Sequence, residues 1–136
     1  MIDIVTSSEA PAAAGTYSPG IVSGGFLFIA GQGPFDADGK LVGDTFAEQV
    51  RQTFRNLEAI AAAAGTSLVN AVRVGIYLRE MANWAELNEV TREFLTEPYP
   101  ARTTIPADLN GFEIEVDAIV ALPRPGGDEE GQTNDR

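Results

Sequence analysis

The sequence of 136 residues contains no cysteine and no histidine. Without cysteine there are no disulfides, no thiolate nucleophiles and no structural zinc sites of the usual kind. Without histidine, the commonest metal ligand and the usual proton shuttle at neutral pH are missing. A metal held by carboxylates alone has no spacing motif to support it, so we expect no metal and no cofactor. Chemistry here must rely on arginine, carboxylate, hydroxyl and backbone groups.

Basic residues are also scarce. Nine lysines and arginines face 20 aspartates and glutamates, which gives a net charge of −11. Affinity for nucleic acid comes largely from basic side chains that displace counterions, so we expect no nucleic-acid partner. No apolar run approaches the roughly 20 residues of a membrane helix, and the first residues lack the features of a secretory signal. We expect no membrane partner and a cytoplasmic protein.

The length fits one domain with a real hydrophobic core. The segment after Leu122 changes character: a Pro-Arg-Pro-Gly-Gly run leads into a polar, charged stretch that cannot bury enough apolar surface to offset its ordering entropy. We therefore predict a single domain over 1–123 and a disordered acidic tail over 124–136.

Two helices are predicted from capping signals and apolar spacing. Thr45 precedes Glu48 by three residues, the capping-box pattern, and Gly65 is suited to end the helix. Apolar residues recur between them at helical spacing: Phe46, Val50, Phe54, Leu57, Ala61 and Ala64. A second helix is predicted from Asn83, with Glu86 in the same cap spacing, and it cannot continue far past Pro98. Its apolar face comprises Trp84, Leu87, Val90 and Phe94.

The remaining patterns indicate strands. Residues 26–29 form a short apolar run, and two later segments alternate apolar and polar side chains: Val72, Val74, Ile76 and Leu78, then Ile114, Val116, Ala118 and Val120. The order of strands and helices predicts an α+β fold with both helices on one face of a mixed sheet. The opposite face is expected to hold Arg73, Tyr77, Glu113, Glu115 and Asp117.

One arginine and three carboxylates dominate the last two predicted strands. Arg102 and Thr104 share one side of the first strand, and Glu115 shares a side of the second with its acidic neighbours. The turn formers of 106–111 suggest an antiparallel hairpin that places the arginine near the carboxylates. The alternative is a half-exposed strand whose arginine makes a surface ion pair of little energetic value.

Two further segments have both a structural and a functional interpretation. Gly31 and Gly33 follow a buried-looking strand, where glycine allows a ligand or another chain to approach the backbone closely. The segment is not a phosphate loop, because it lacks the lysine and the following helix start. A bend or bulge that ends the strand explains it equally well. Tyr17 lies in an ordered turn, and its ring can also reach into a pocket.

Taken together, the motifs from about residue 10 to 122 resemble the Rid (YjgF/YER057c/UK114) family of imine and enamine deaminases. They occur in the order typical of that family: Gly15-Thr16-Tyr17-Ser18-Pro19-Gly20, Ala30-Gly31-Gln32-Gly33-Pro34, Gln49 with Asn56-Leu57-Glu58-Ala59-Ile60, Ala64-Gly65, Leu87-Asn88-Glu89, Pro100-Ala101-Arg102-Thr103 and Ile114-Glu115-Val116-Asp117-Ala118-Ile119.

The resemblance implies a chorismate-mutase-like protomer in a homotrimer, with sheets forming a central barrel, helices outside and sites in the clefts between subunits. It implies hydrolysis of 2-enamine and 2-imino acids to 2-oxo acids and ammonia. In that role Arg102 grips the substrate carboxylate, for which a planar guanidinium is suited. Glu115 orients or deprotonates the attacking water. Tyr17, Gly31, Asn88 and Thr104 line the pocket.

Several residues also fit other interpretations. The archetype of the family has serine where this chain has Ala30, so one hydrogen bond is missing and the substrate can differ, for example a larger amino-unsaturated acid. Asn88 is equally well explained as a polar surface residue, and Thr104 as a β-branched strand former. A non-catalytic protein that binds small carboxylates is the main alternative. Ribonuclease activity, proposed for some relatives, conflicts with the charge.

Overall fold

A single six-stranded sheet forms the framework of the protein, and the computed structural model describes residues 2–124. In order across the sheet the strands are β1 (Asp3–Val5), β2 (Gly20–Ser23), β3 (Phe26–Gln32), β6 (Ile114–Ala121), β4 (Ala71–Leu78) and β5 (Ala101–Pro106). Neighbouring strands are antiparallel except β4 and β5, which are parallel. The mixed sheet predicted from the sequence is confirmed.

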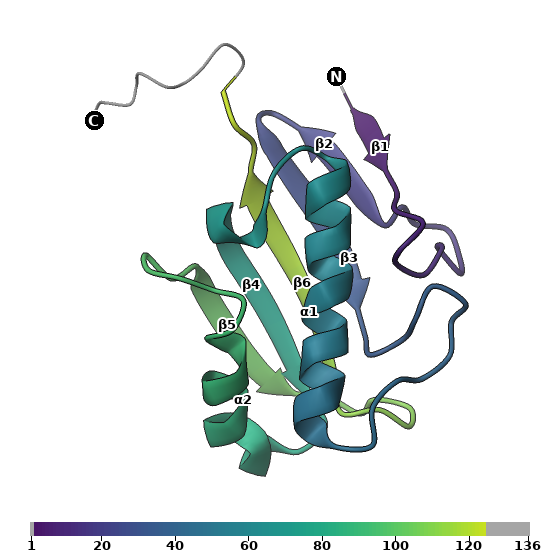
Figure 1. Ribbon diagram of the computed structural model, residues 1–136, viewed down its shortest axis with the longest axis vertical. Coiled ribbons are helices and arrows are strands. Elements are labelled where there is room, and N and C mark those ends of the chain that lie inside the picture. The colour runs from purple at the N-terminus through teal and green to yellow at the C-terminus, as the bar shows by residue number, and fades with distance from the viewer. Residues whose placement is uncertain (1, 125–136) are drawn as a thin grey trace.

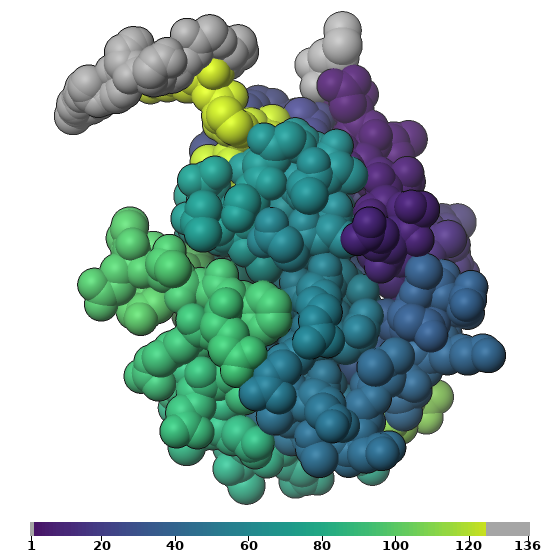
Figure 2. Space-filling model, viewed as in Figure 1, coloured from purple at the N-terminus to yellow at the C-terminus, as the bar shows by residue number. Residues whose placement is uncertain are grey.

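Both helices cover the same face of this sheet (Figure 1). They are α1 (Phe46–Ala63) and α2 (Trp84–Thr91), and short 3-10 turns at Leu68–Asn70 and Met81–Asn83 precede β4 and α2. In the space-filling view from this side, the helices and their adjoining loops hide most of the sheet (Figure 2). The predicted arrangement, with two helices on one face, is therefore confirmed.

The hydrophobic core lies between the helices and the sheet. Its largest fully buried side chains include Leu27, Val50, Phe54, Leu57, Ile60, Val74, Ile76, Leu78, Ile114 and Val116. Burial of each such side chain contributes roughly 1.5–3 kcal/mol. The period of two along β4 and β6 and the helical spacing along α1 place these residues on facing surfaces.

The alternation fails at one predicted position, Val72, which is exposed. The register of β4 against β6 shifts between Ala71 and Arg73, so the extra residue of a bulge falls at Val72 and turns it away from the core. Ala71 is buried in its place.

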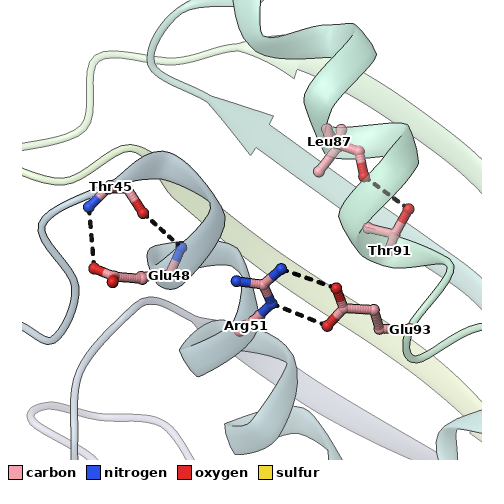
Figure 3. A network of polar contacts seen from close by, with 6 residues as sticks. All are labelled: Thr45, Glu48, Arg51, Leu87, Thr91 and Glu93. Carbon is pink, nitrogen blue, oxygen red and sulfur yellow. Dashed lines mark hydrogen bonds and ion pairs between the residues drawn. The ribbon is translucent and has the colours of Figure 1, made fainter.

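The start of α1 matches its prediction. Thr45 accepts a hydrogen bond from the Glu48 backbone, and the Glu48 side chain accepts one from the Thr45 backbone (Figure 3). Gly65 follows the helix with φ of 82°, a left-handed conformation that favours glycine. On the outer surface, the Arg51 guanidinium of α1 makes two 2.9 Å hydrogen bonds to Glu93, just past α2.

The second helix differs from its prediction at both ends. Asn83 makes no side-chain capping bond, because the 3-10 turn runs directly into α2 and leaves Asn83 near φ −85°, ψ 8° instead of extended. The helix ends at Thr91, so Phe94 lies beyond it, although Phe94 still stacks on Phe54. Trp84 is 45% exposed and does not belong to the buried face formed by Leu87 and Val90.

The predicted hairpin between the last two strands is wrong. β5 pairs only with β4, in parallel, while β6 lies between β3 and β4. The connection from β4 through α2 to β5 is a helical crossover, which joins parallel strands. The loop after Pro106 therefore carries the chain past β4 to the middle of the sheet rather than back along β5.

Residue 1 and residues 125–136 lie outside the part that the structure describes. Of the disordered tail predicted over 124–136, only Arg124 is among the described residues. Within the described residues, no helix is long and apolar enough to cross a membrane.

Candidate functional site

The six residues singled out from the sequence form two groups. Arg102, Asn88 and Thr104 come together beside α2, on the helix side of the sheet. Tyr17, Gly31 and Glu115 line a separate hollow near the end of β3. The sheet separates the two groups.

Arg102 projects from the edge strand β5 toward α2. Its neighbour across the parallel pair is the buried Val74, and Thr104 pairs with the buried Ile76, so both side chains belong to the core-facing side. The Arg102 Nε–H donates to Thr104 Oγ1 at 2.8 Å, and Nη1–H donates to Asn88 Oδ1 at 2.7 Å. Asn88 and Thr104 therefore both accept hydrogen bonds from the Arg102 guanidinium, in addition to their places on the helix and the strand.

The guanidinium carries no compensating carboxylate. Among residues 2–124, no acidic oxygen lies within 4.0 Å of an Arg102 nitrogen. Partial burial lowers the pKa of Arg102, but the guanidinium stays charged at all ordinary pH values. An unpaired, partly desolvated cation is suited to an anionic ligand.

Arg102 lines a hollow of about 320 Å³ between β5 and the segment that follows α2. The other lining residues are Val74, Asn88, Thr91, Arg92, Leu95, Tyr99 and Pro100. Its lining combines polar side chains such as Asn88 and Arg102 with the apolar side chains of Val74 and Leu95, which are nearly fully buried. The hollow can therefore hold a carboxylate at Arg102 together with apolar substituents.

The second group lies around Glu115, on the face of the sheet away from the helices. Glu115 pairs with Tyr77 across β6 and β4, and its carboxylate lies over the backbone of Gly31. A Cβ atom at position 31 would overlap that carboxylate, so the close approach requires glycine. Near this point the register of β3 against β6 shifts between Ile29 and Gln32, as the bulge interpretation anticipated.

The hollow beside Glu115 has a volume of about 290 Å³ and is bordered by aromatic rings and backbone. Its residues include Tyr17, Gly31, Gly33, Phe35 and Phe112. Tyr17 is 52% exposed, and its hydroxyl oxygen accepts a hydrogen bond from the Ala14 backbone at 3.0 Å. The Tyr17 hydroxyl proton thus remains available to a ligand.

Glu115 has an unusual electrostatic environment. Burial raises the pKa of its carboxyl group, and the nearby Asp117 raises it further. Asp117 itself accepts a 3.0 Å hydrogen bond from the Tyr77 hydroxyl and lies 3.7 Å from Arg73. Gly75 leaves room for these groups, since a Cβ there would lie 2.6 Å from Asp117 Oδ1. A carboxyl group with a raised pKa is a stronger base than an ordinary glutamate once it is ionised.

Two buried amides of α1 hold the backbone around this hollow, and the sequence analysis gave them no role beyond their motif. Asn56 donates to the carbonyls of Gly33 and Phe35, at 3.1 and 2.7 Å. Gln49 accepts from the Glu113 backbone at 2.9 Å. Both residues lie on the buried side of α1, and a polar residue among the apolar positions of a helix is the sequence pattern that indicates such a buried hydrogen-bonding role.

Arg102 and Glu115 do not meet within one chain. Arg102 lies on the helix side of the edge strand, whereas Glu115 lies on the other face of a central strand. Among the described residues there is also no group of three or more acidic side chains placed to hold a metal ion. The arrangement is an α+β fold with an arginine pocket on one side of its sheet and a carboxylate pocket on the other.

Comparisons with known proteins identify the family. A family model described as endoribonuclease L-PSP matches residues 7–122. The RutC family protein y4sK of Sinorhizobium fredii is 38% identical over 125 residues, which span 90% of this chain and 99% of that protein. The chain therefore belongs to the Rid family, as its motifs predicted. Relatives from two yeasts are named as mitochondrial proteins.

Solved structures agree. RidA from the Antarctic bacterium Psychrobacter superposes with a TM-score of 0.82 at 35% identity, over 88% of this chain and 99% of that one. The crystal structure of E. coli TdcF with bound serine gives a TM-score of 0.79 at 28% identity, over 88% and 98% of the two chains. The fold of the Rid family is thus the fold of this chain.

Proposed function

We propose that the protein hydrolyses reactive 2-imino acids, and the 2-enamines that tautomerise to them, to 2-oxo acids and ammonia. The observation that carries the proposal is the unpaired guanidinium of Arg102, held by Asn88 and Thr104 at the edge of a pocket. The membership of the Rid family supports it.

Arg102 binds the substrate carboxylate in this proposal. A guanidinium has five N–H donors in a planar fork that matches a carboxylate in bidentate geometry. Two donors of Arg102 are bound within its own chain, which leaves three for a ligand. Asn88 and Thr104 thereby act as positioning residues, which refines the expectation that they line the pocket.

Glu115 positions and activates water. As the water oxygen bonds to the imine carbon and the C=N π bond opens, one water proton passes to the Glu115 carboxylate, which then gives it to the nitrogen. In the resulting carbinolamine the hydroxyl proton is transferred to the amino nitrogen, the C–N bond breaks, and ammonia leaves as the carbonyl of the 2-oxo acid forms. The imine carbon is already electrophilic, so positioning and general-base help of about 10²–10⁴-fold suffice. Tyr17 and the backbone at Gly31 border the same hollow and complete the pocket.

The two halves of the site require a second copy of the chain. Since Arg102 and Glu115 project from opposite faces of one sheet, a site with both residues needs Arg102 of one subunit and Glu115 of its neighbour. The face away from the helices supports such an interface, because it exposes Phe26 and Phe28 beside polar groups. We expect the homotrimer of the family.

A second candidate function is binding without catalysis, as in a regulatory protein that holds a small carboxylate at Arg102. The serine bound to TdcF favours it, because serine is itself a small amino acid with a carboxylate. A larger amino-unsaturated acid is an alternative substrate, which the hollow at Arg102 can admit. We do not propose ribonuclease activity, because a net charge of −11 opposes RNA binding.

A coupled assay tests the proposal. A pyridoxal-phosphate lyase or dehydratase generates 2-aminoacrylate or 2-aminocrotonate, and the decay of the imine is followed with wild-type protein and with Arg102→Ala. The proposal predicts acceleration by the wild-type protein alone. Binding of a 2-oxo acid without acceleration on either substrate would favour the non-catalytic alternative. Acceleration that survives in the variant would remove Arg102 from the mechanism.

A further inference from the structure

Trp84 forms the third contact of the Arg102 guanidinium. The Cζ atom of Arg102 lies 4.9 Å from the centroid of the indole ring, over its face. Trp84 is the first residue of α2, and Asn88 follows four residues later on the same side of the helix. One helical turn thus supplies both a stacking surface and a hydrogen-bond acceptor to the same cation.

The three contacts fix the guanidinium in complementary ways. Thr104 and Asn88 accept hydrogen bonds from two of its N–H groups, which sets the rotation of the guanidinium within its own plane. Cζ, the centre of the guanidinium, lies over the indole ring, and this cation–π contact resists displacement of the cation from its position. The remaining N–H groups lie in a fixed plane, as a bidentate carboxylate requires.

The indole ring also stabilises the positive charge of the partly buried guanidinium. A carboxylate partner from the same chain would stabilise the Arg102 cation, but it would occupy the N–H groups that a ligand needs. An aromatic face stabilises a cation through its quadrupole and leaves the N–H groups free. The described chain has no carboxylate within 4.0 Å of Arg102, and it has the indole ring instead.

Core packing does not account for Trp84. Trp84 is 45% exposed, while Leu87 in the same helix is fully buried. A large aromatic ring left partly in water contributes less to the core than a buried one. The indole ring lies under the Arg102 guanidinium, in a cation–π contact.

We propose that Trp84 is a positioning residue that stacks on Arg102 and holds its guanidinium in the orientation that binds the carboxylate of substrate and product. This inference rests on the proposed role of Arg102 as the carboxylate ligand. It adds a residue that acts through Arg102, and it predicts that an aromatic ring, not bulk, is what position 84 requires.

The test compares Trp84→Phe, which keeps an aromatic ring, with Trp84→Leu, which keeps only apolar bulk. Met81→Leu is the matched control, because Met81 is an exposed apolar residue of the turn just before α2. Binding of 2-oxobutanoate is measured by calorimetry, and kcat and KM are measured on the imine. Trp84 is the only tryptophan, so its fluorescence reports directly on the pair in the wild-type protein.

We expect Trp84→Leu to weaken 2-oxobutanoate binding and raise KM about five-fold, with kcat within about two-fold of wild type. Trp84→Phe should stay within about two-fold of wild type in all three quantities, as should Met81→Leu. Saturating 2-oxobutanoate should change the fluorescence of the wild-type protein but not that of Arg102→Ala.

A purely structural role would give a different pattern. It would lower the melting temperature and the active fraction, hence kcat, and leave KM unchanged. That pattern, or equal losses in Trp84→Phe and Trp84→Leu, would overturn the inference. Wild-type protein that binds 2-oxobutanoate without hydrolysing imines would refute the deaminase function alone, and the inference would then stand or fall on the binding data. Failure of the wild type to bind 2-oxobutanoate would overturn the inference as well.

Discussion

Arg102 and Glu115 lie on opposite faces of one sheet, Arg102 on the edge strand β5 and Glu115 on the central strand β6, with β4 between them. A single chain therefore presents two half-sites. The arginine half has a free cation and no base, and the glutamate half has a base with a raised pKa beside a second carboxylate. In the proposed mechanism, each half supplies what the other lacks for hydrolysis of an imino acid.

The first prediction separates the residue that binds substrate from a residue that positions it. Arg102→Ala should abolish activity, with a loss of about 100-fold or more in kcat/KM, because a charged pair of hydrogen bonds to the carboxylate is removed. Thr104→Ala should cost less than about five-fold, because Asn88 still holds the guanidinium. Steady-state kinetics on the same imine distinguish the two. Equal losses would contradict the assigned roles.

The second prediction concerns Gly31. In Gly31→Ala the new Cβ displaces the Glu115 carboxylate, so kcat should fall about as far as it does in Glu115→Gln, on the order of 10²-fold for loss of a general base. The double variant should be no slower than either single one, because both changes remove the same function. Additive losses would show that Gly31 acts independently of Glu115.

The third prediction is a pH dependence. The pKa of Glu115 is raised, first by burial and then by Asp117, and the proposed base must be ionised. The value of kcat/KM should therefore rise with pH through a pKa above that of an ordinary glutamate. Asp117→Asn removes the second cause of the raised Glu115 pKa, so the rise of kcat/KM with pH should occur at a lower pH in this variant. If the rise of kcat/KM occurred at the same pH in Asp117→Asn as in the wild-type protein, Glu115 would be excluded as the titrating base.

The same shift has a stability consequence of definite sign. Because the folded protein holds the Glu115 proton more tightly than the unfolded chain, it binds more protons between the two pKa values. The contribution of Glu115 to stability is therefore present below the unfolded pKa and is lost as pH rises through the folded one. Denaturant unfolding of Glu115→Gln at several pH values should show a weaker decline over that interval than the wild-type protein.

A fourth prediction compares two buried polar neighbours in α1. Asn56 donates two hydrogen bonds to loop carbonyls, whereas the buried hydroxyl of Thr53 has no partner among the described residues. Asn56→Ala should destabilise the protein by about 1–3 kcal/mol, because the carbonyls of Gly33 and Phe35 each lose the hydrogen bond from Asn56 and the Gln52 amide loses an acceptor. Thr53→Val should be neutral or stabilising. The stabilities of both variants are measured by urea unfolding. Similar losses of stability in Asn56→Ala and Thr53→Val would contradict the role given to the Asn56 hydrogen bonds.

Local signals in the sequence predicted most of the fold. Thr45 and Glu48 form the expected capping box, and the alternation in residues 114–120 correctly marks the core side of β6. These features depend on neighbouring residues, so a short window of sequence contains them. The family motifs extended the prediction to the whole architecture.

The pairing of β5 was not predictable in the same way. The turn formers after Pro106 favour a hairpin, but the crossover through α2 places β5 beside β4 instead. Alternation put Arg102 and Thr104 on one side of a strand without deciding which face of the sheet that is. Their register against Val74 and Ile76 decides it. Trp84 was assigned to an apolar stripe, because periodicity does not distinguish a core residue from one that stacks on an arginine.

The central claim is that Arg102 and Glu115 of different subunits act together, and subunit mixing tests it most directly. Arg102→Ala and Glu115→Gln chains, carrying different affinity tags, are co-expressed and mixed oligomers are isolated through both tags. In a mixed trimer one cleft of three combines an intact arginine with an intact glutamate, so activity should return to about one third of wild type from two inactive parents. Mixed oligomers as inactive as their parents would contradict the claim.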